Sequence, residues 1–224
     1  MENLIHALIP ARKGSKGIKN KNFLKIDSLS LVDRAINYCS NHPLIYSFTL
    51  STDNESYTAP KNILNFNIDI RKKNLSADDS KIDEVVFDFI KKNNLKGAKY
   101  LALIEPTSPC RTNKDLFDVY DYFMKNNLDS CFTLSKVPSK YHYKKQFILN
   151  QQNKEGKVNN YGSINRQELE TTGIRNGLVY LTKISSILKF KSLICGKIGF
   201  ILTNRKVINI DHYQDLENYK NHLS

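Results

Sequence analysis

The feature that most constrains the fold is an alternation of short apolar runs with segments of helical periodicity. Apolar runs bounded by polar loops predict buried strands at residues 4–10, 45–53, 66–71, 100–105, 130–135, 177–182 and 206–210. Apolar side chains recurring every three or four residues predict helices at 30–42, 81–94, 113–127 and 213–223. Strands alternating with helices favour right-handed crossovers and a mainly parallel sheet. We therefore predict a three-layer α/β/α fold.

Three polar loops follow predicted strands: "IPARKGSKGIKNKN" (9–22), "STD" (51–53) and "EPTSPCR" (105–111). Because the carboxyl ends of parallel strands meet at one edge of a sheet, we expect these loops to converge. The first loop holds five cations and two glycines, a composition that suits phosphate binding through backbone N–H groups and charged side chains. It lacks the GxxxxGK[ST] and GxGxxG patterns. A nucleotide or phosphosugar site is favoured over a solvated basic loop.

The alternation stops at residues 136–169, which are rich in Lys, Asn and Gln. This segment is predicted as a hairpin or extended arm that turns at "NKEG". Its apolar content is too low for independent folding, and Phe147 and Ile148 need a partner. We therefore predict one domain from residues 1–135 and 170–224, and a homodimer formed by the arm at 136–169.

Charge and composition exclude several function classes. The net charge of +12 would suit nucleic acid, but the cations are spread along the chain without a basic helix or RNP-like motif. A phosphate-bearing small molecule explains the local clusters better. No apolar run approaches the roughly 18 residues of a membrane span, and the N-terminal region lacks the order of a signal peptide. We expect a cytoplasmic protein whose four scattered cysteines are small buried side chains.

The first loop closely resembles the opening signature of the CMP-sialic acid synthetases, or acylneuraminate cytidylyltransferases. "STD", "IRKKNLSADDSKIDEVV", "EPTSPCR", "RNGLVY" and "INIDHYQDLE" resemble further motifs of that family in the same order, over essentially the whole chain. The CMP-Kdo synthetases, which open differently, fit less well. The resemblance implies a Rossmann-like nucleotidyltransferase fold. It also implies that CTP and a nine-carbon 2-keto sugar acid, of the sialic or legionaminic type, form a CMP-sugar and pyrophosphate with Mg²⁺ or Mn²⁺.

Three alternatives remain open at this point. The first is another sugar cytidylyltransferase, such as a CMP-Kdo-like enzyme. The second is a catalytically degenerate nucleotide-binding homologue, which departures from the family at Glu105 and Asn209 would explain. Nucleic-acid binding comes last.

The resemblance also implies roles for individual residues. Arg12 and Lys21 match catalytic cations that bind the triphosphate, and Lys16 is expected near phosphate. The expected substrate-binding residues are Asn22 at the nucleoside, Arg71 beside the cytosine pocket, Ser80 in the following loop, Glu105 and Ser108 near the sugar, Lys145 in the arm, and Arg175 with Asn176 before the "NG" strand. The family usually has Gln where Glu105 stands. Arg111 could contact substrate or anchor its loop to backbone carbonyls.

The arm and the C-terminal region carry two further expectations. His142 and Lys145 resemble a family motif that the arm brings to the active site of the partner subunit. The family binds its metal with two Asp separated by one residue, whereas this chain has Asn209, Ile210 and Asp211. Alternation on a strand would put 209 and 211 on one face. Because Mg²⁺ prefers anionic oxygens, Asp211 is expected to carry most of the metal binding, with Asn209 as a second ligand. Asp215 is expected in the first turn of the last helix, where the helix dipole favours it.

Overall fold

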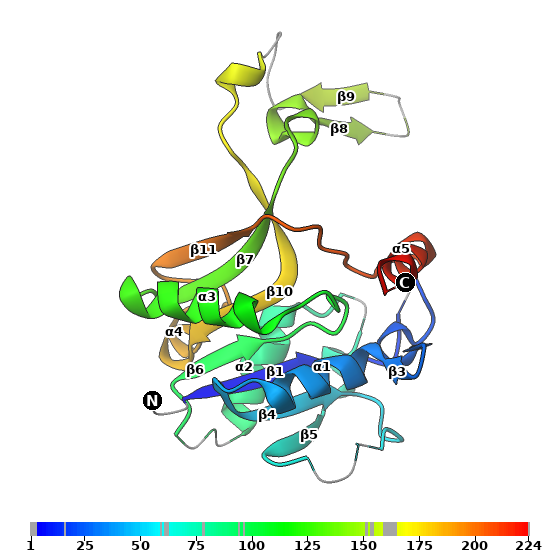
Figure 1. The fold of residues 1–224 in the computed structure, drawn as a ribbon, viewed down its shortest axis with the longest axis vertical. Coiled ribbons are helices and arrows are strands. Elements are labelled where there is room, and N and C mark those ends of the chain that lie inside the picture. Colours follow the sequence, from blue (N-terminus) through cyan, green and yellow to red (C-terminus); the bar gives the residue numbers. More distant parts are fainter. Residues whose placement is uncertain are drawn as a thin grey trace.

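A computed structural model describes residues 4–15, 17–58, 60, 63–77, 79–93, 95, 97–150, 152, 155–158 and 165–223. Its centre is a seven-stranded sheet in the order β11-β7-β10-β6-β1-β4-β5 (Figure 1). The strands are β1 (Ile5–Pro10), β4 (Ile45–Thr52), β5 (Phe66–Ile70), β6 (Tyr100–Leu103), β7 (Ser130–Lys136), β10 (Gly173–Lys183) and β11 (Ile198–Thr203). Only β10 runs antiparallel to its neighbours within this sheet. The predicted, mainly parallel α/β fold is confirmed.

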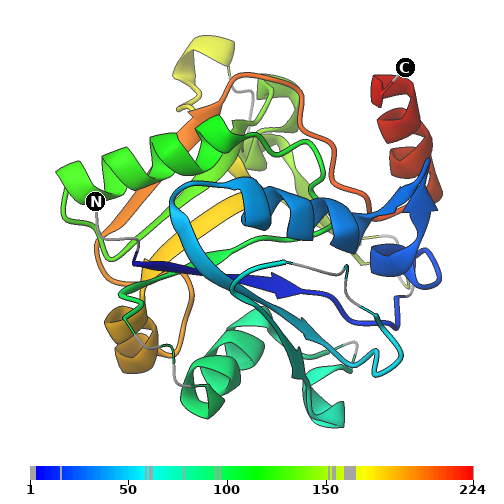
Figure 2. The ribbon, with the colours of Figure 1, turned by 60° about the horizontal axis from the view of Figure 1, so that its bottom comes forward.

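Helices cover both faces of the sheet, as Figure 2 shows. Helices α1 (Leu31–Asn41) and α3 (Asn113–Lys125) pack on one face, and α2 (Ile82–Lys92) and α4 (Ile184–Phe190) pack on the other. The apolar stripe of α1 is buried, as its spacing predicted. The Ser30 side chain caps α1 by accepting a hydrogen bond from the Asp33 N–H at 3.1 Å, and Asp33 returns the contact. Local sequence and tertiary packing therefore agree in this helix.

The predicted strand at residues 206–210 is wrong. The edge of the sheet is formed by β11, and residues 206–210 have no strand pairing. Ile208 and Ile210 pack into a small satellite core with Ile18 and Leu216, whereas Val207 packs against the main core. The segment is tied to a neighbouring loop by a backbone hydrogen bond, in which the Ile210 N–H donates to the Thr107 carbonyl at 2.8 Å. Burial against two separate cores thus produced an apolar run that resembles a strand but is not part of a sheet.

The segment between β7 and β10 stands away from the sheet (Figure 1). It contains η3 (Ser139–Tyr141), η4 (Tyr143–Lys145), β8 (Phe147–Asn150), β9 (Glu155–Val158) and η5 (Arg166–Glu168). Strands β8 and β9 pair antiparallel, so the predicted hairpin is confirmed. Asn153 and Lys154 of the predicted turn lie outside the described residues. Phe147, Ile148 and Leu149 are 61%, 65% and 70% exposed, which leaves both faces of β8 uncovered.

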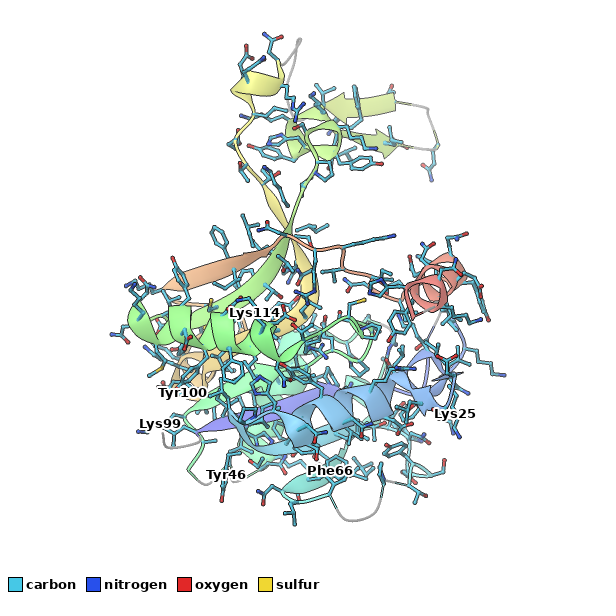
Figure 3. The ribbon with its side chains drawn as sticks, viewed as in Figure 1. Lys25, Tyr46, Phe66, Lys99, Tyr100 and Lys114 are labelled. Atoms are coloured by element: carbon cyan, nitrogen blue, oxygen red, sulfur yellow. The ribbon has the colours of Figure 1, made fainter. Side chains whose placement is uncertain are left out.

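Small elements gather at the carboxyl end of β1. They are η1 (Lys21–Phe23), β2 (Lys25–Ile26), β3 (Leu29–Ser30), η2 (Lys73–Leu75) and the C-terminal helix α5 (Tyr213–Leu223). Figure 3 marks the two ends of the sheet: Lys99 and Tyr100 lie where β6 begins, and Lys25 lies at the opposite end, beside α5. The satellite core joins α5 to β2 and to residue Ile18 of the opening loop.

The cysteines and the helix lengths bear on two expectations drawn from composition. All four cysteines are thiols, of which Cys39, Cys131 and Cys195 are buried and Cys110 is partly exposed. Within the described ranges, no helix has the length and apolar character needed to span a bilayer.

Candidate active site

A cleft of about 440 Å³ opens at the carboxyl ends of β1, β5 and β6. The loops predicted to converge do meet here. The Ala11 N–H donates to the Ser51 carbonyl at 2.9 Å, and the Lys13 N–H donates to the Asp53 carboxylate at 2.6 Å. The cleft is lined by Pro10, Arg12, Ser15, Gly17, Lys21, Asn22, Arg71, Leu75, Ala77, Ser80, Ile82, Val85, Glu105, Pro106, Thr107, Asp211 and His212.

The opening loop packs directly against the C-terminal segment that carries Asp211. A Cβ atom placed on Gly17 would lie 2.3 Å from the Asp211 carbonyl oxygen, so only glycine allows this approach. On the cleft side, the Lys21 ammonium forms an ion pair with the Asp211 carboxylate, at 2.7 Å. Two residues that are 190 positions apart thus share one wall of the cleft.

Asn22 supplies a hydrogen-bond acceptor that the fold leaves unused. Its side chain is buried, and its Nδ2 donates to the Arg12 carbonyl at 3.0 Å. Its Oδ1 is buried and has no hydrogen-bond partner among the described residues. An unsatisfied buried acceptor is costly, about 1–3 kcal/mol, and such groups commonly wait for a ligand. Since Asn22 lines the cleft, a donor on the ligand can satisfy it.

Arg71 also lines the cleft and is held by hydrogen bonds to Ser51. Its Nε donates to the Ser51 hydroxyl at 2.9 Å, and a terminal nitrogen donates to the Ser51 carbonyl at 2.8 Å. Burial lowers the pKa of the Arg71 guanidinium to about 10, which leaves it charged at neutral pH. Leu75, Ile82 and Val85 add apolar surface beside it. Together they form a half-apolar wall with one fixed cation, which suits a planar base.

Glu105 lies between the cleft and a smaller hollow. The hollow, about 120 Å³, is lined by Ile82, Asp83, Leu103, Glu105, Arg175, Tyr180, Ser192, Leu193 and Ile194. Burial raises the pKa of the Glu105 carboxyl, although the positive charges of Arg111 and Arg175 act in the opposite direction. Its carboxylate also crowds Gly177, which has a φ of +67° and no room for a Cβ atom. Glu105 is therefore a half-buried acid that borders both the cleft and the hollow.

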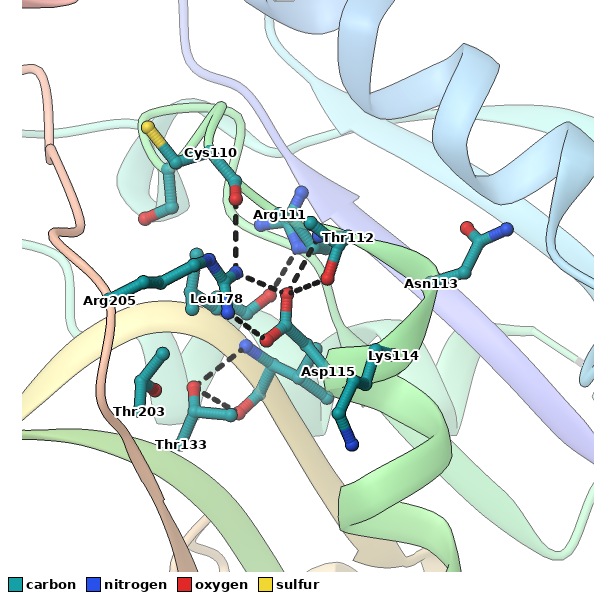
Figure 4. A network of polar contacts seen from close by, with 12 residues as sticks. Cys110, Arg111, Thr112, Asn113, Lys114, Asp115, Thr133, Leu178, Thr203 and Arg205 are labelled. Atoms are coloured by element: carbon teal, nitrogen blue, oxygen red, sulfur yellow. Dashed lines mark hydrogen bonds and ion pairs between the residues drawn. The ribbon is translucent and has the colours of Figure 1, made fainter.

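Arg111 anchors its loop and does not line the cleft, so the anchoring alternative is confirmed. Its guanidinium donates to the carbonyls of Glu105, at 2.8 Å, of Gly177, at 3.2 Å, and of Leu178. Burial lowers the pKa of Arg111, with partial compensation by nearby acidic groups. Figure 4 shows Arg205 nearby, donating to the Cys110 carbonyl at 3.0 Å and to the Asp115 carboxylate at 2.6 Å.

Asn176, Ser108 and Asn209 also belong to the framework behind the cleft. The Asn176 amide bonds to the hydroxyls of Thr133 at 2.6 Å and Thr203 at 2.9 Å, inside the sheet. The buried Ser108 hydroxyl donates to Asn209 Oδ1 at 2.8 Å. None of the three is among the residues that line the cleft. Their predicted contacts with substrate or metal stay predictions.

The remaining predicted residues lie in different parts of the molecule. Ser80 lines the cleft, and its hydroxyl donates to the Asn74 carbonyl at 2.7 Å. Arg175 lies at the hollow beside Glu105. Lys145 lies in the arm, in a separate basic surface with Lys140 and Arg166. Lys16 lies outside the described residues.

Three residues that line the cleft were not predicted from the sequence, whereas the position of Asp215 was. Ser15, Thr107 and His212 line the cleft without having been singled out. Their places inside or next to the quoted motifs could have identified them. Asp215 lies in the first turn of α5, as predicted, and its carboxylate accepts hydrogen bonds from the backbone N–H groups of Asp211 and His212.

The carboxylates at the cleft determine whether it could hold a divalent ion. The described part of the chain holds no group of three or more His, Cys, Asp or Glu side chains that could bind a metal alone. The acidic side chains at the cleft are Glu105 and Asp211. Because Mg²⁺ keeps several waters and uses one or two carboxylates together with substrate phosphates, this set fits an ion that shares a triphosphate. Asp211 is the exposed carboxylate of the two and is the better placed ligand.

A mainly parallel sheet with a cation-lined cleft at its carboxyl edge defines a nucleotide-binding α/β protein. The sequence matches the family described as cytidylyltransferase over residues 6–167, and the chain belongs to that family. The prediction of a cytidylyltransferase is therefore confirmed at the level of the family.

The chain is also similar to individual proteins. It is 26% identical over 220 residues to the post-translational flagellin modification protein B of Campylobacter coli, covering 93% of this chain and 90% of that protein. It is 22% identical to an N-acylneuraminate cytidylyltransferase of Streptococcus agalactiae over 96% of this chain, and spans about half (52%) of that relative. A solved CMP:2-keto-3-deoxy-manno-octonic acid synthetase complexed with CTP has the same fold, with a TM-score of 0.68, 11% identity and 98% of each chain covered.

Proposed function

We propose that the protein transfers the cytidylyl group of CTP to a nonulosonic acid of the sialic or legionaminic type and releases pyrophosphate. The observation that carries the proposal is the composition of the cleft. Arg12 and Lys21 of the opening loop, Arg71 with its apolar neighbours, and Asn22 line the same cleft, and the buried Asn22 Oδ1 has no hydrogen-bond partner among the described residues. Such a site suits a ligand that combines phosphates, a base and a hydrogen-bond donor.

The residues of the chain act mainly by binding and orientation. Arg12 and Lys21 offset the negative charge of the triphosphate, and Arg71 and Asn22 hold the nucleoside. On the Glu105 side of the cleft the anomeric hydroxyl of the sugar acid attacks the α-phosphorus, the bond from that phosphorus to the bridging oxygen breaks, pyrophosphate leaves, and the hydroxyl proton is released to solvent. Holding both reactants in one geometry removes much of the entropic barrier. A divalent ion on Asp211 would supply further neutralisation of the triphosphate.

The acceptor sugar is proposed from the relatives and from the hollow. Both named relatives concern acidic-sugar or flagellin chemistry, as their descriptions state. The hollow adjoins the cleft through Glu105, and its apolar members, Leu103 and Leu193, could receive a short acyl group. Arg175 provides a cation on the same side for the substrate carboxylate.

The direct test is pyrophosphate release from CTP with a panel of nonulosonic acids and with Kdo. We expect release with at least one nonulosonic acid and much less with Kdo or with UTP. Efficient release with Kdo alone would favour the CMP-Kdo-like alternative. Tight CTP binding without release with any sugar would favour the degenerate homologue.

We also propose that the protein works as a cytoplasmic homodimer joined by the arm. The exposed Phe147, Ile148 and Leu149 on β8 are apolar surface that a second copy can cover. His142 and Lys145 would then lie near the partner's cleft. Light scattering at micromolar concentration should give a dimer, and a double Phe147→Lys, Leu149→Lys variant should be monomeric. A fully active wild-type monomer would contradict this proposal. CTP is available in the cytoplasm, and the four free thiols suit a reducing compartment.

A further inference from the structure

The ion pair between Lys21 and Asp211 joins the two side chains that the proposed reaction needs for different ligands. Lys21 is the cation expected to bind phosphate, and Asp211 is the carboxylate expected to bind a divalent ion. Their charged atoms are 2.7 Å apart, and their side chains are 14% and 63% exposed, respectively. In this state each charge is offset by the other, so neither is fully available to a ligand.

The backbone around the pair is held in place by other contacts. The Asp211 carbonyl packs on Gly17, and the Asp211 N–H donates to the Asp215 carboxylate at 3.0 Å. Ile18 comes three residues before Lys21 and Ile210 directly precedes Asp211, and these two isoleucines share the satellite core. The two side chains can therefore change partners without moving the segments that carry them. A partly exposed ion pair is itself weak, so a ligand can open it.

We propose that this ion pair couples the binding of the divalent ion to that of the triphosphate, so that the cleft takes the metal–nucleotide complex in preference to either component alone. This proposal rests on the proposed function of the same cleft. A free divalent ion that approaches Asp211 meets the Lys21 ammonium beside it and is repelled. A metal-free triphosphate that approaches Lys21 meets the Asp211 carboxylate in the same way.

The metal–nucleotide complex meets neither obstacle. Its phosphates attract Lys21, its metal attracts Asp211, and the pair is replaced by two new charge contacts. Because linkage is reciprocal, the factor by which nucleotide raises metal affinity equals the factor by which metal raises nucleotide affinity. Loss of one repulsive unit charge a few ångströms from the ion corresponds to roughly a tenfold change in affinity.

The test measures Mn²⁺ binding to the nucleotide-free protein by electron paramagnetic resonance of the free ion. Lys21→Met should bind Mn²⁺ about tenfold more tightly than wild type, because Asp211 is released. Lys19→Met removes the same charge from an exposed position in the same loop and is the matched control, with affinity close to wild type. Asp211→Asn should abolish the gain in the Lys21→Met background. Equal Mn²⁺ affinity in wild type and Lys21→Met would overturn the proposal.

The reciprocal arm measures CTP binding in EDTA by calorimetry. Asp211→Asn should bind metal-free CTP about tenfold more tightly than wild type, because Lys21 is released. Unchanged or weaker binding by Asp211→Asn would also overturn the coupling. The proposed function fails on a different result: wild-type protein that binds no CTP even with Mn²⁺ present. The two failures are therefore distinguishable, and neither arm depends on turnover.

Discussion

The close contact between Gly17 and the Asp211 carbonyl leads to a prediction for Gly17→Ala. The new Cβ atom would lie 2.3 Å from the carbonyl oxygen, whereas ordinary contact begins at 3.4 Å. The opening loop and the C-terminal segment must therefore separate by about 1 Å, and misplacement by that amount can cost about a hundredfold in rate. We expect kcat/KM for pyrophosphate release to fall about a hundredfold.

The matched control is Gly14→Ala in the same loop, because nothing lies within 4 Å of its added Cβ atom. This variant should keep activity within a few-fold of wild type. Gly14→Ala should unfold within about 1 kcal/mol of wild type, whereas Gly17→Ala should lose about 1–3 kcal/mol because its Cβ atom forces two packed segments apart. Equal activity of the two variants would refute the reasoning that the Gly17 contact positions Asp211. A loss of stability in Gly17→Ala well beyond that range would make the contact structural.

Three further predictions concern buried ionisable groups. Burial raises the pKa of Glu105, so its contribution to stability is present below pH 4.5 and lost as pH rises through the raised value. Glu105→Gln should therefore raise the melting temperature at pH 7 by about 2–4 °C but not at pH 4, in calorimetric scans, and an equal shift at both pH values would contradict this. Burial lowers the pKa of His6 to about 4, so its contribution is present above pH 6.5 and lost as pH falls toward 4. Urea unfolding should give about 2 kcal/mol less stability at pH 5 than at pH 7, and His6→Gln should reduce this difference. Arg111→Met should cost about 3 kcal/mol or more in denaturant unfolding, because it strands buried carbonyls; lost activity with unchanged stability would instead make Arg111 a substrate contact.

The sequence predicted most of the fold because strand and helix periods differ sharply in this chain. The helix at α1 was predictable from its apolar spacing and from Ser30, whose capping contact is local. Helix α4 was missed, since it has only seven residues and little periodicity. The segment at 206–210 was misread because Ile208 and Ile210 are buried on one side by a satellite core and not by a sheet. Periodicity reports which side chains are buried, and it does not report what buries them.

The same limit applies to the candidate site. Loops after parallel strands were expected to converge, and Arg12, Lys21, Asn22 and Arg71 do line one cleft. Asn176 is quoted in the same motifs, yet its amide is bonded inside the sheet. A motif identifies residues that a site requires, but it does not separate side chains that face the ligand from those that hold the loops. That distinction depends on the β10 backbone near Gly177, which turns through a positive φ.

The most direct test of the central claim is ³¹P NMR of the purified protein with CTP, Mg²⁺ and a nonulosonic acid. The CTP resonances should decline while pyrophosphate and a new phosphodiester resonance of the CMP-sugar appear in equal amounts. A Lys21→Met, Arg71→Met double variant should form neither product, because the cleft then lacks cations that hold the triphosphate and the nucleoside. CTP that remains unchanged with every acid tested, or that is hydrolysed to CMP without a sugar adduct, would contradict the account.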